Sequence, residues 1–145
     1  MRVTFDTSIF ISRKKIVYPT LLSVVVIQEI MAGAIDSAEI RDWMATAKKY
    51  DKDGLLLVPT AEDWVQAGKV LNSLLRGLKS KARGKARGKT PKLSHLQKQN
   101  LIRDVLIART VKRVGAALVT DNLDDFRAIS TYCRVRLISG KEYFS

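Results

Sequence analysis

Short apolar segments typical of strands alternate with helical segments along this 145-residue chain, and this alternation limits the fold more than any other feature. Continuous runs of Val, Ile, Leu and Ala are typical of strands buried on both faces of a parallel sheet. Such runs occur at residues 3–5, 21–26, 55–58, 116–119 and 135–138. Because helical segments lie between most of them, the sequence predicts an α/β fold: a mostly parallel central sheet of four to five strands, with helices on both faces.

The helical segments are recognisable from their capping residues and their apolar spacing. Residues 36–39 and 94–97 both have the spacing of a capping box, and residues 60–63 cap a further helix. Apolar residues recur at helical spacing on the helices that follow, and Trp43 and Trp64 belong to these stripes. We therefore expect both tryptophans to lie in the core.

The composition bounds the class of protein. With 46% hydrophobic residues the chain can bury a core of its own, so we expect one domain spanning residues 1–145. The one cysteine, Cys133, excludes an intramolecular disulfide, and with His95 as the one histidine it also excludes a zinc quartet. No apolar run approaches the ~20 residues of a membrane span, and the N-terminus lacks a signal-peptide pattern. We expect a cytoplasmic protein with no membrane association.

The net charge of +12 is concentrated in one part of the chain. No acid occurs between Asp63 and Asp104, and the basic residues there include Lys69, Arg76, Lys98 and Arg103. A one-sided block of positive charge attracts polyanions, of which nucleic acid is the commonest. The alternative is a solvated loop whose lysines only keep the protein soluble.

The centre of this block is residues 79–92, which we expect to form a flexible basic loop between two helices. Within it, residues 81–89 contain a near repeat with glycine at every fourth position and no apolar residue larger than alanine. Such a segment cannot bury apolar surface. Its candidate nucleic-acid contacts are Lys79, Lys81, Arg83, Lys85, Arg87, Lys89 and Lys92.

Acidic residues from separate parts of the chain are expected at one edge of the sheet. Asp6 follows the first strand and residues 121–125 follow the fourth, and the carboxyl ends of parallel strands meet at one edge. Glu29 and Asp104 interrupt apolar helical faces, where an unpaired carboxylate costs several kcal/mol unless a basic group or a metal offsets it. Taken alone, Asp6 is more often a turn residue, and acids in 121–125 include helix caps.

A cluster of carboxylates of this kind predicts a divalent cation. Like charges raise one another's pKa values, and a cation relieves that conflict. Oxygen ligands without cysteine or histidine select Mg²⁺ or Mn²⁺ over zinc. These ions suit an enzyme that acts on a phosphodiester. With two ions ~4 Å apart, one activates water and the other stabilises the leaving oxygen; whether one or two ions bind stays open.

Residues 3–8, 23–33, 104–108 and 118–126, taken in that order, resemble the motifs of the PIN-domain ribonucleases. Within that family the chain is most similar to the VapC toxins of toxin–antitoxin pairs, over nearly its whole length. The resemblance implies a PIN-like three-layer fold. The metal ligands that it implies are Asp6, Glu29 and Asp104, and the supporting hydroxyls are Thr7 or Ser8 and Thr120.

The chain departs from the family pattern at the fourth acid and at the basic segment. Asn122 stands where family members frequently have Asp, so that Asp121 or Asp125 takes over this role. Asp124 is a further acid in the same segment. The candidate catalytic set is therefore Asp6, Glu29, Asp104, Asp121 and Asp125, with Asp125 as the fourth metal ligand. The family's equivalent of residues 79–92 is usually shorter and less charged.

The resemblance implies a Mg²⁺- or Mn²⁺-dependent endoribonuclease that hydrolyses RNA phosphodiester bonds by metal-activated water. It also implies inhibition by a cognate VapB-like antitoxin and assembly as a homodimer. Two alternatives stay open: a PIN nuclease in RNA processing with no antitoxin, and a basic RNA-binding module without catalysis.

Overall fold

A computed structural model describes residues 2–13, 20–85 and 93–145. For residues 79–85 it describes the backbone alone. The strands are β1 (Val3–Phe5), β2 (Leu22–Ser23), β3 (Leu56–Leu57), β4 (Ala117–Thr120) and β5 (Arg136–Ser139). The helices are α1 (Thr7–Arg13), α2 (Val24–Ala32), α3 (Ser37–Lys52), α4 (Ala61–Lys85), α5 (His95–Val114), α6 (Leu123–Ser130) and α7 (Gly140–Tyr143).

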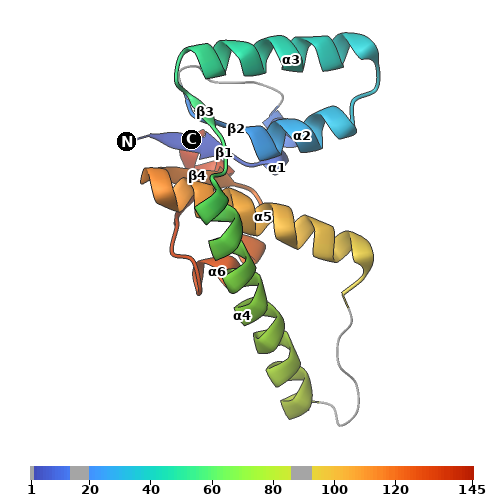
Figure 1. Cartoon of the computed structure of the whole chain (residues 1–145), viewed down its shortest axis with the longest axis vertical. Helices are drawn as coiled ribbons and strands as arrows, with labels where there is room; N and C mark the ends of the chain where they lie inside the picture. Colours follow the sequence, from blue (N-terminus) through green and yellow to red (C-terminus); the bar gives the residue numbers. More distant parts are fainter. Residues whose placement is uncertain (1, 14–19, 86–92) are drawn as a thin grey trace.

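The strands are all parallel to their neighbours. One sheet has the order β1-β4-β5, and β2 pairs with β3. An isolated parallel bridge between Thr4 and Leu21 joins β1 to the β2-β3 pair, so that the strands run in the order β3-β2-β1-β4-β5. Figure 1 shows α2 and α3 on one side of these strands and α5 and α6 on the other. The predicted parallel sheet with helices on both faces is confirmed.

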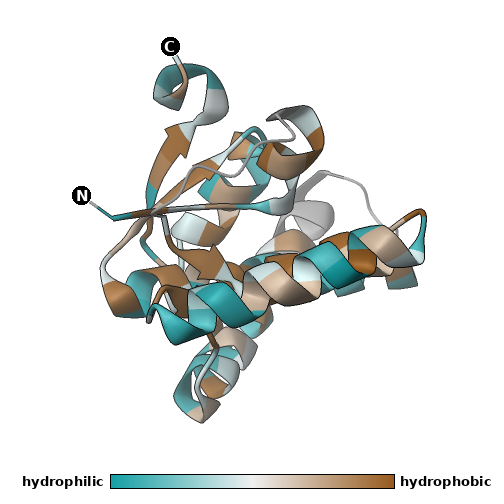
Figure 2. Ribbon diagram, turned by 90° about the horizontal axis from the view of Figure 1, so that it is seen from above, coloured by the Kyte–Doolittle hydropathy of each residue, from teal (hydrophilic) through white to brown (hydrophobic). Residues whose placement is uncertain are grey.

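The core lies between the strands and these helices. Strand β4 is buried along its whole length, and Phe5, Ile107 and Phe126 are among the largest fully buried side chains. Burial of a side chain of this size contributes roughly 1.5–3 kcal/mol. Figure 2 shows the hydrophobic residues concentrated in the strands, whereas α3 carries both hydrophilic and hydrophobic residues along its length. Among the described helices, none has the length and hydropathy of a membrane span.

The predicted start of α5 is confirmed. The N–H of Gln97 donates to Ser94 Oγ at 3.1 Å, and the N–H of Ser94 donates to Gln97 Oε1 at 2.8 Å, which completes a capping box. At the other end Gly115 has a φ of 68°, a left-handed conformation that glycine adopts without a Cβ clash. These ends fix the register of α5, which carries Asp104.

Residues 24–26 were expected to continue the second strand, and this expectation is wrong. The strand ends at Ser23, whose Oγ accepts a hydrogen bond from Val25 N–H at 3.2 Å and caps α2. The valines that follow form the first turn of the helix, where Val25 and Val26 are buried. The cap and the burial of this turn outweigh the strand preference of β-branched residues.

The basic segment differs from the expected loop in its first half. Helix α4 continues to Lys85, so that Lys79, Lys81, Arg83 and Lys85 belong to a helix. Lysine, arginine and alanine are good helix formers, and they outweigh the ~1 kcal/mol cost of Gly84 in the helix. Arg87, Lys89 and Lys92 lie outside the described residues. Figure 1 shows the end of α4 extending away from the strands.

The expectation that both tryptophans lie in the core is wrong for Trp64 and is confirmed for Trp43, which packs against the core. Trp64 is 57% exposed on the outer side of α4, because Asp63, Ala67 and Val70 occupy the buried side. Trp43 is half-buried and packs edge-to-face against Phe10. Helical spacing identified a stripe but not which part of it faces the core.

The C-terminal residues that follow β5 form the short helix α7. Ser139 Oγ accepts a hydrogen bond from Glu142 N–H at 3.0 Å and caps this helix. Tyr143 and Phe144 then pack against Phe5, with ring centroids 5.4 and 5.9 Å away. Because Phe5 immediately precedes Asp6, the C-terminus supports the strand that carries the first candidate acid.

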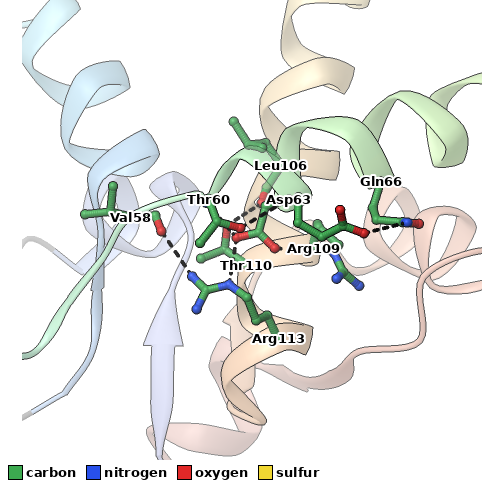
Figure 3. A network of polar contacts seen from close by, with 9 residues as sticks. Val58, Thr60, Asp63, Gln66, Leu106, Arg109, Thr110 and Arg113 are labelled. Atoms are coloured by element: carbon green, nitrogen blue, oxygen red, sulfur yellow. Dashed lines mark hydrogen bonds and ion pairs between the residues drawn. The ribbon is translucent and has the colours of Figure 1, made fainter.

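A buried polar network fastens the start of α4 to the end of α5 (Figure 3). Asp63 is fully buried and accepts hydrogen bonds from Arg113 Nε at 2.8 Å and from the N–H of Thr60 at 3.0 Å. Arg109 Nε lies 3.3 Å from its other oxygen, and Arg113 also donates to the carbonyl of Val58. Burial alone would raise the pKa of Asp63, but the Thr60 N–H and the Arg113 guanidinium outweigh it and hold the pKa below its usual value.

Candidate active site

Asp6 lies where β1 ends beside β4. In the strand order β3-β2-β1-β4-β5, strands β1, β2 and β3 follow one another toward one edge of the sheet, and β4 and β5 follow one another toward the opposite edge. Open α/β sheets bind ligands at the carboxyl ends of the strands where the order reverses in this way. The N–H of Asp6 donates to the carbonyl of Val119 at 3.2 Å, which ties it to the end of β4. The fold therefore places Asp6 at the expected edge.

Asp6 is only 5% exposed, and its carboxylate accepts hydrogen bonds from two hydroxyls. Thr120 Oγ1 donates to one oxygen at 2.8 Å, and Ser8 Oγ donates to the other. Burial raises the pKa of Asp6, the Ser8 and Thr120 hydroxyls lower it in part, and the charge of Asp121 raises it further. Two of the three predicted supporting hydroxyls thus contact Asp6.

Glu29 is on α2 and has a side chain that is 20% exposed. Burial raises its pKa, the charge of Asp6 adds to this, and Arg103 and the Thr7 hydroxyl lower it. Thr7 therefore lies at Glu29, whereas Ser8 lies at Asp6. Among the described residues, neither Thr7 Oγ1 nor Glu29 Oε1 makes a hydrogen bond of full geometry, although both atoms are buried. Each of these two oxygens can therefore accept a contact from a ligand.

Asp104 is on α5, and its carboxyl has a strongly raised pKa. Burial raises its pKa to about 7, with smaller contributions from the charges of Glu29, Asp6 and Asp125 and a counteracting one from Arg103. The four acids therefore lie close enough to interact, as the sequence predicted. Without a cation, about half of the Asp104 carboxyl groups carry a proton at pH 7.

The segment after β4 supplies two acids that interact with different partners. Asp125 accepts a hydrogen bond from Asn122 Nδ2 at 2.9 Å and acts electrostatically on Asp104. Asp121 accepts one from Ser12 Oγ at 2.8 Å and acts on Asp6.

Asp124 differs from these two acids. Its side chain is 98% exposed and lies 3.7 Å from Arg127, one turn further along α6. Asp121 and Asp125 thus remain candidates for the fourth position, whereas Asp124 is on the solvent side.

Three residues near these acids were not predicted as site residues. Ser12 holds Asp121, and Gly140 gives it room, because a Cβ at Gly140 would collide with the Asp121 carboxylate. Arg103 Nε lies 3.8 Å from Glu29 Oε1. Ser12 lies one helical turn after Ser8, and this spacing could have predicted Ser12 as a site residue. No local sequence pattern indicated Gly140.

The predicted nucleic-acid contacts are only partly described. The backbone of Lys79, Lys81, Arg83 and Lys85 follows the end of α4. The other three, Arg87, Lys89 and Lys92, lie among residues 86–92, outside the described ranges. Further basic side chains on α4 and α5 are exposed: Lys69, Arg76 and Lys98.

The acids suit a hard divalent cation in their chemistry but do not enclose one. In the described ranges, no three Asp, Glu, His or Cys side chains gather closely enough to hold a metal ion by themselves. Mg²⁺ commonly takes only one or two carboxylates and completes its shell with water and substrate oxygens. The buried oxygens of Glu29 and Thr7 that lack full hydrogen bonds, together with the raised pKa values, fit such a cation.

Comparison with known proteins bears on the fold. No protein-family model and no curated protein matches the chain. Among solved structures, it is similar to a chain of VapBC-1 from nontypeable Haemophilus influenzae, with a TM-score of 0.59 and 18% identity over 96% of this chain and 98% of that one. A chain of DNA-bound VapBC from Salmonella typhimurium gives 0.58 and 18% over the same shares. The chain therefore has the fold of these VapBC chains, and the three-layer α/β arrangement that the resemblance implied is confirmed.

Proposed function

We propose that this chain is a Mg²⁺- or Mn²⁺-dependent endoribonuclease of the VapC toxin type, which hydrolyses RNA phosphodiester bonds. The observation that carries the proposal is the gathering of Asp6, Glu29 and Asp104 at the reversal point of the sheet, where burial, and to a smaller extent the charges of Glu29 and Asp6, raise the pKa of Asp104 to about 7. Carboxylates that destabilise one another in this way favour a bound cation. The VapC-like fold supports the same function by analogy.

The side chains have distinct roles in this proposal. Asp6, Glu29 and Asp104 hold the cation, with Asp121 or Asp125 as the fourth acid. Thr120 and Ser8 fix the carboxylate of Asp6, and Ser12 fixes that of Asp121.

A bound Mg²⁺ or Mn²⁺ would supply an activated water and offset the charge of the phosphate. The chain itself keeps Asp104 ready to lose its proton when a cation arrives, because its pKa is close to neutral pH.

RNA is the substrate class that the charge distribution favours. The exposed side chains Lys69, Arg76 and Lys98 lie on α4 and α5. Lys79, Lys81, Arg83 and Lys85 belong to the last part of α4, and Arg87, Lys89 and Lys92 lie between the two helices in sequence. Each lysine or arginine that contacts a phosphate releases a counterion, so that binding weakens steeply with salt. The basic block would hold the strand while the acids act on one phosphate.

We also propose a VapB-like antitoxin as the inhibitor and a homodimer as the assembly. Both similar structures are described as VapBC, and that description is the basis of the first proposal. The basic block equally suits an RNA-binding module without catalysis, and the same fold suits an RNA-processing nuclease without an antitoxin. The experiments below separate these alternatives.

The test is cleavage of RNA by the purified chain with Mg²⁺ or Mn²⁺ and with EDTA. Asp6→Asn and Asp104→Asn should each lower the rate by on the order of 100-fold or more, because even indirect partners of a metal contribute 10–100-fold. The matched control is Asp124→Asn, since that side chain is 98% exposed.

The rate of the control variant should equal that of the parent. Parent-like cleavage by the Asp6 or Asp104 variant would contradict the mechanism. RNA binding without cleavage by the parent would favour the RNA-binding module, and toxicity in cells that a co-expressed upstream reading frame relieves would support the antitoxin.

A further inference from the structure

Arg103 is the basic side chain beside the acids of the site. It immediately precedes Asp104 on α5, and its Nε lies 3.8 Å from Glu29 Oε1. Its side chain is 33% exposed, so that one part of the guanidinium faces Glu29 and another part reaches solvent. Arg103 therefore stands at the rim of the acidic site.

The contact between Arg103 and Glu29 is loose. Charge-assisted N–H···O bonds are about 2.7–2.9 Å long, so a separation of 3.8 Å is an electrostatic contact without a hydrogen bond. Within the described ranges, both Arg103 Nε and Glu29 Oε1 are buried and form no hydrogen bond. By contrast, Arg113 Nε donates to Asp63 at 2.8 Å. Arg103 thus keeps a free donor next to the site.

A second residue orients the guanidinium. Arg103 Nη2 donates to Asn100 Oδ1 at 2.7 Å, from one turn earlier on the same helix. A guanidinium held at one nitrogen is pre-oriented, and its remaining N–H groups keep the planar arrangement that matches two oxygens of a phosphate. Asn100 is therefore a positioning residue for Arg103.

An acidic site that acts on a phosphodiester needs positive charge where the phosphate arrives. Arg103 acts electrostatically on both Glu29 and Asp104, which shows that its charge reaches both acids. A bound cation would interact with Glu29 in place of Arg103, and the guanidinium would then lose its weak electrostatic contact.

We propose that Arg103 binds the phosphate of the RNA that enters the acidic site, and that it rests beside Glu29 when no RNA is bound. This inference rests on the proposed function and adds a residue that contacts the substrate. It predicts opposite effects of Arg103→Gln on two ligands: weaker binding of RNA, because a phosphate contact is lost, and tighter binding of Mn²⁺, because a positive charge leaves the acids.

RNA binding is measured with a short fluorescein-labelled single-stranded RNA and the full chain carrying Asp6→Asn, which suppresses cleavage. Adding Arg103→Gln should weaken binding about tenfold and lower the salt slope by about 0.7. Mn²⁺ binding is measured by calorimetry on the chain without Asp6→Asn, where Arg103→Gln should tighten it by roughly threefold or more. Arg41 is an exposed arginine on α3, and Arg41→Gln is the control for net charge. It should change the RNA affinity and the Mn²⁺ affinity by less than Arg103→Gln does.

Each outcome decides the inference. Unchanged RNA affinity overturns it, including the case in which Mn²⁺ alone binds more tightly, because Arg103 is then only a counter-ion of Glu29. If Arg103→Gln does not fold, Asn100→Ala serves instead, since it keeps the charge and removes the orientation; RNA binding should weaken several-fold, and parent-like binding overturns the inference.

These readouts do not depend on turnover. A parent chain that cleaves RNA while Arg103→Gln keeps the parent's RNA affinity contradicts this inference alone. A parent chain that never cleaves, but loses RNA affinity with Arg103→Gln, contradicts the proposed function alone.

Discussion

Two places in this molecule bury a carboxylate beside arginine, and they do so in opposite ways. Asp63 is met by Arg109 and Arg113 together with a backbone N–H, and its pKa is below the usual value. Glu29 and Asp104 lie near Arg103, whose Nε is 3.8 Å from Glu29, and the pKa values of both acids are raised. The first arrangement satisfies its charge within the fold. The second leaves a charge conflict that a ligand can resolve.

The difference teaches how to separate a structural buried acid from a functional one. Burial alone does not distinguish them, because Glu29 and Asp104 are also largely withdrawn from water, although less completely than the fully buried Asp63. The distinguishing feature is whether the chain itself supplies the compensating donors. At Asp63 it does, between α4 and α5; at the end of β1 it supplies two hydroxyls to Asp6 and then adds further acids.

Removing the structural acid should have the largest effect on stability. Asp63→Asn leaves Arg109 and Arg113 without their shared partner, and we expect a loss of about 3 kcal/mol in the free energy of unfolding, at the low end for a buried pair because both arginines are partly exposed. Urea denaturation measures this. A loss below about 1 kcal/mol would mean that the network in Figure 3 is not what fastens α4 to α5.

The pH dependence of stability should have opposite signs for the two acids. The folded-state pKa of Asp104 is raised from 3.8 to about 7, so in metal-free protein its contribution to stability is present below about pH 4 and is lost as pH rises to about 7. Three pKa units correspond to at most about 4 kcal/mol. The folded-state pKa of Asp63 is lowered, so its contribution is present above about pH 4 and is lost as pH falls below it.

Denaturation of EDTA-treated protein across pH 4 to pH 7 separates these contributions. Asp104→Asn should flatten the decline in stability over this window and should leave the loss at lower pH unchanged. A decline of equal size in the parent and in Asp104→Asn would assign it to other groups.

A smaller effect should follow from filling the space at Gly140. Gly140→Ala forces the carboxylate of Asp121 away from its place, and if Asp121 is the fourth acid, RNA cleavage should fall about tenfold. Gly33→Ala is the matched control, because a Cβ there meets only two backbone oxygens at 3.8 Å. Full activity of Gly140→Ala, with loss of activity in Asp125→Asn, would assign the fourth position to Asp125.

The smallest effect per residue concerns the basic block. Replacing the lysines and arginines of residues 81–89 by glutamine should weaken RNA binding and lower the salt slope by up to about 0.7 for each phosphate contact that is lost. Mn²⁺ binding should stay as in the parent, since the acids are unchanged. Titration of labelled RNA at several salt concentrations measures the slope, and an unchanged slope would make this segment a solvated bystander.

Local patterns predicted the elements whose boundaries depend on neighbouring residues. The helix caps and the alternation of strand and helix needed only a few consecutive residues, and they predicted the parallel sheet and the edge at which Asp6 lies. Where the outcome depended on tertiary packing, the predictions were wrong. Val25 and Val26 are buried in the first turn of α2 instead of extending β2, and Trp64 is exposed because other residues of α4 face the core.

The candidate acids were predictable for a related reason. Glu29 and Asp104 interrupt apolar faces, which is visible in sequence, and both interact electrostatically with Asp6 in the structure. The contacts that position them were not predictable. Ser12 donates to Asp121, which lies 109 positions later in the chain. Gly140, which follows β5, lies against the same carboxylate.

The central claim is that the mutually destabilised acids form a cation site, and proton release on Mn²⁺ binding tests it most directly. Calorimetry at pH 7 in two buffers of different ionisation enthalpy measures the protons released. Because the pKa of Asp104 is about 7, binding should release about half a proton from this carboxyl, and Asp104→Asn should abolish that share while Asp124→Asn keeps it. Mn²⁺ binding without proton release, or equal release in the Asp104 variant, would contradict the account.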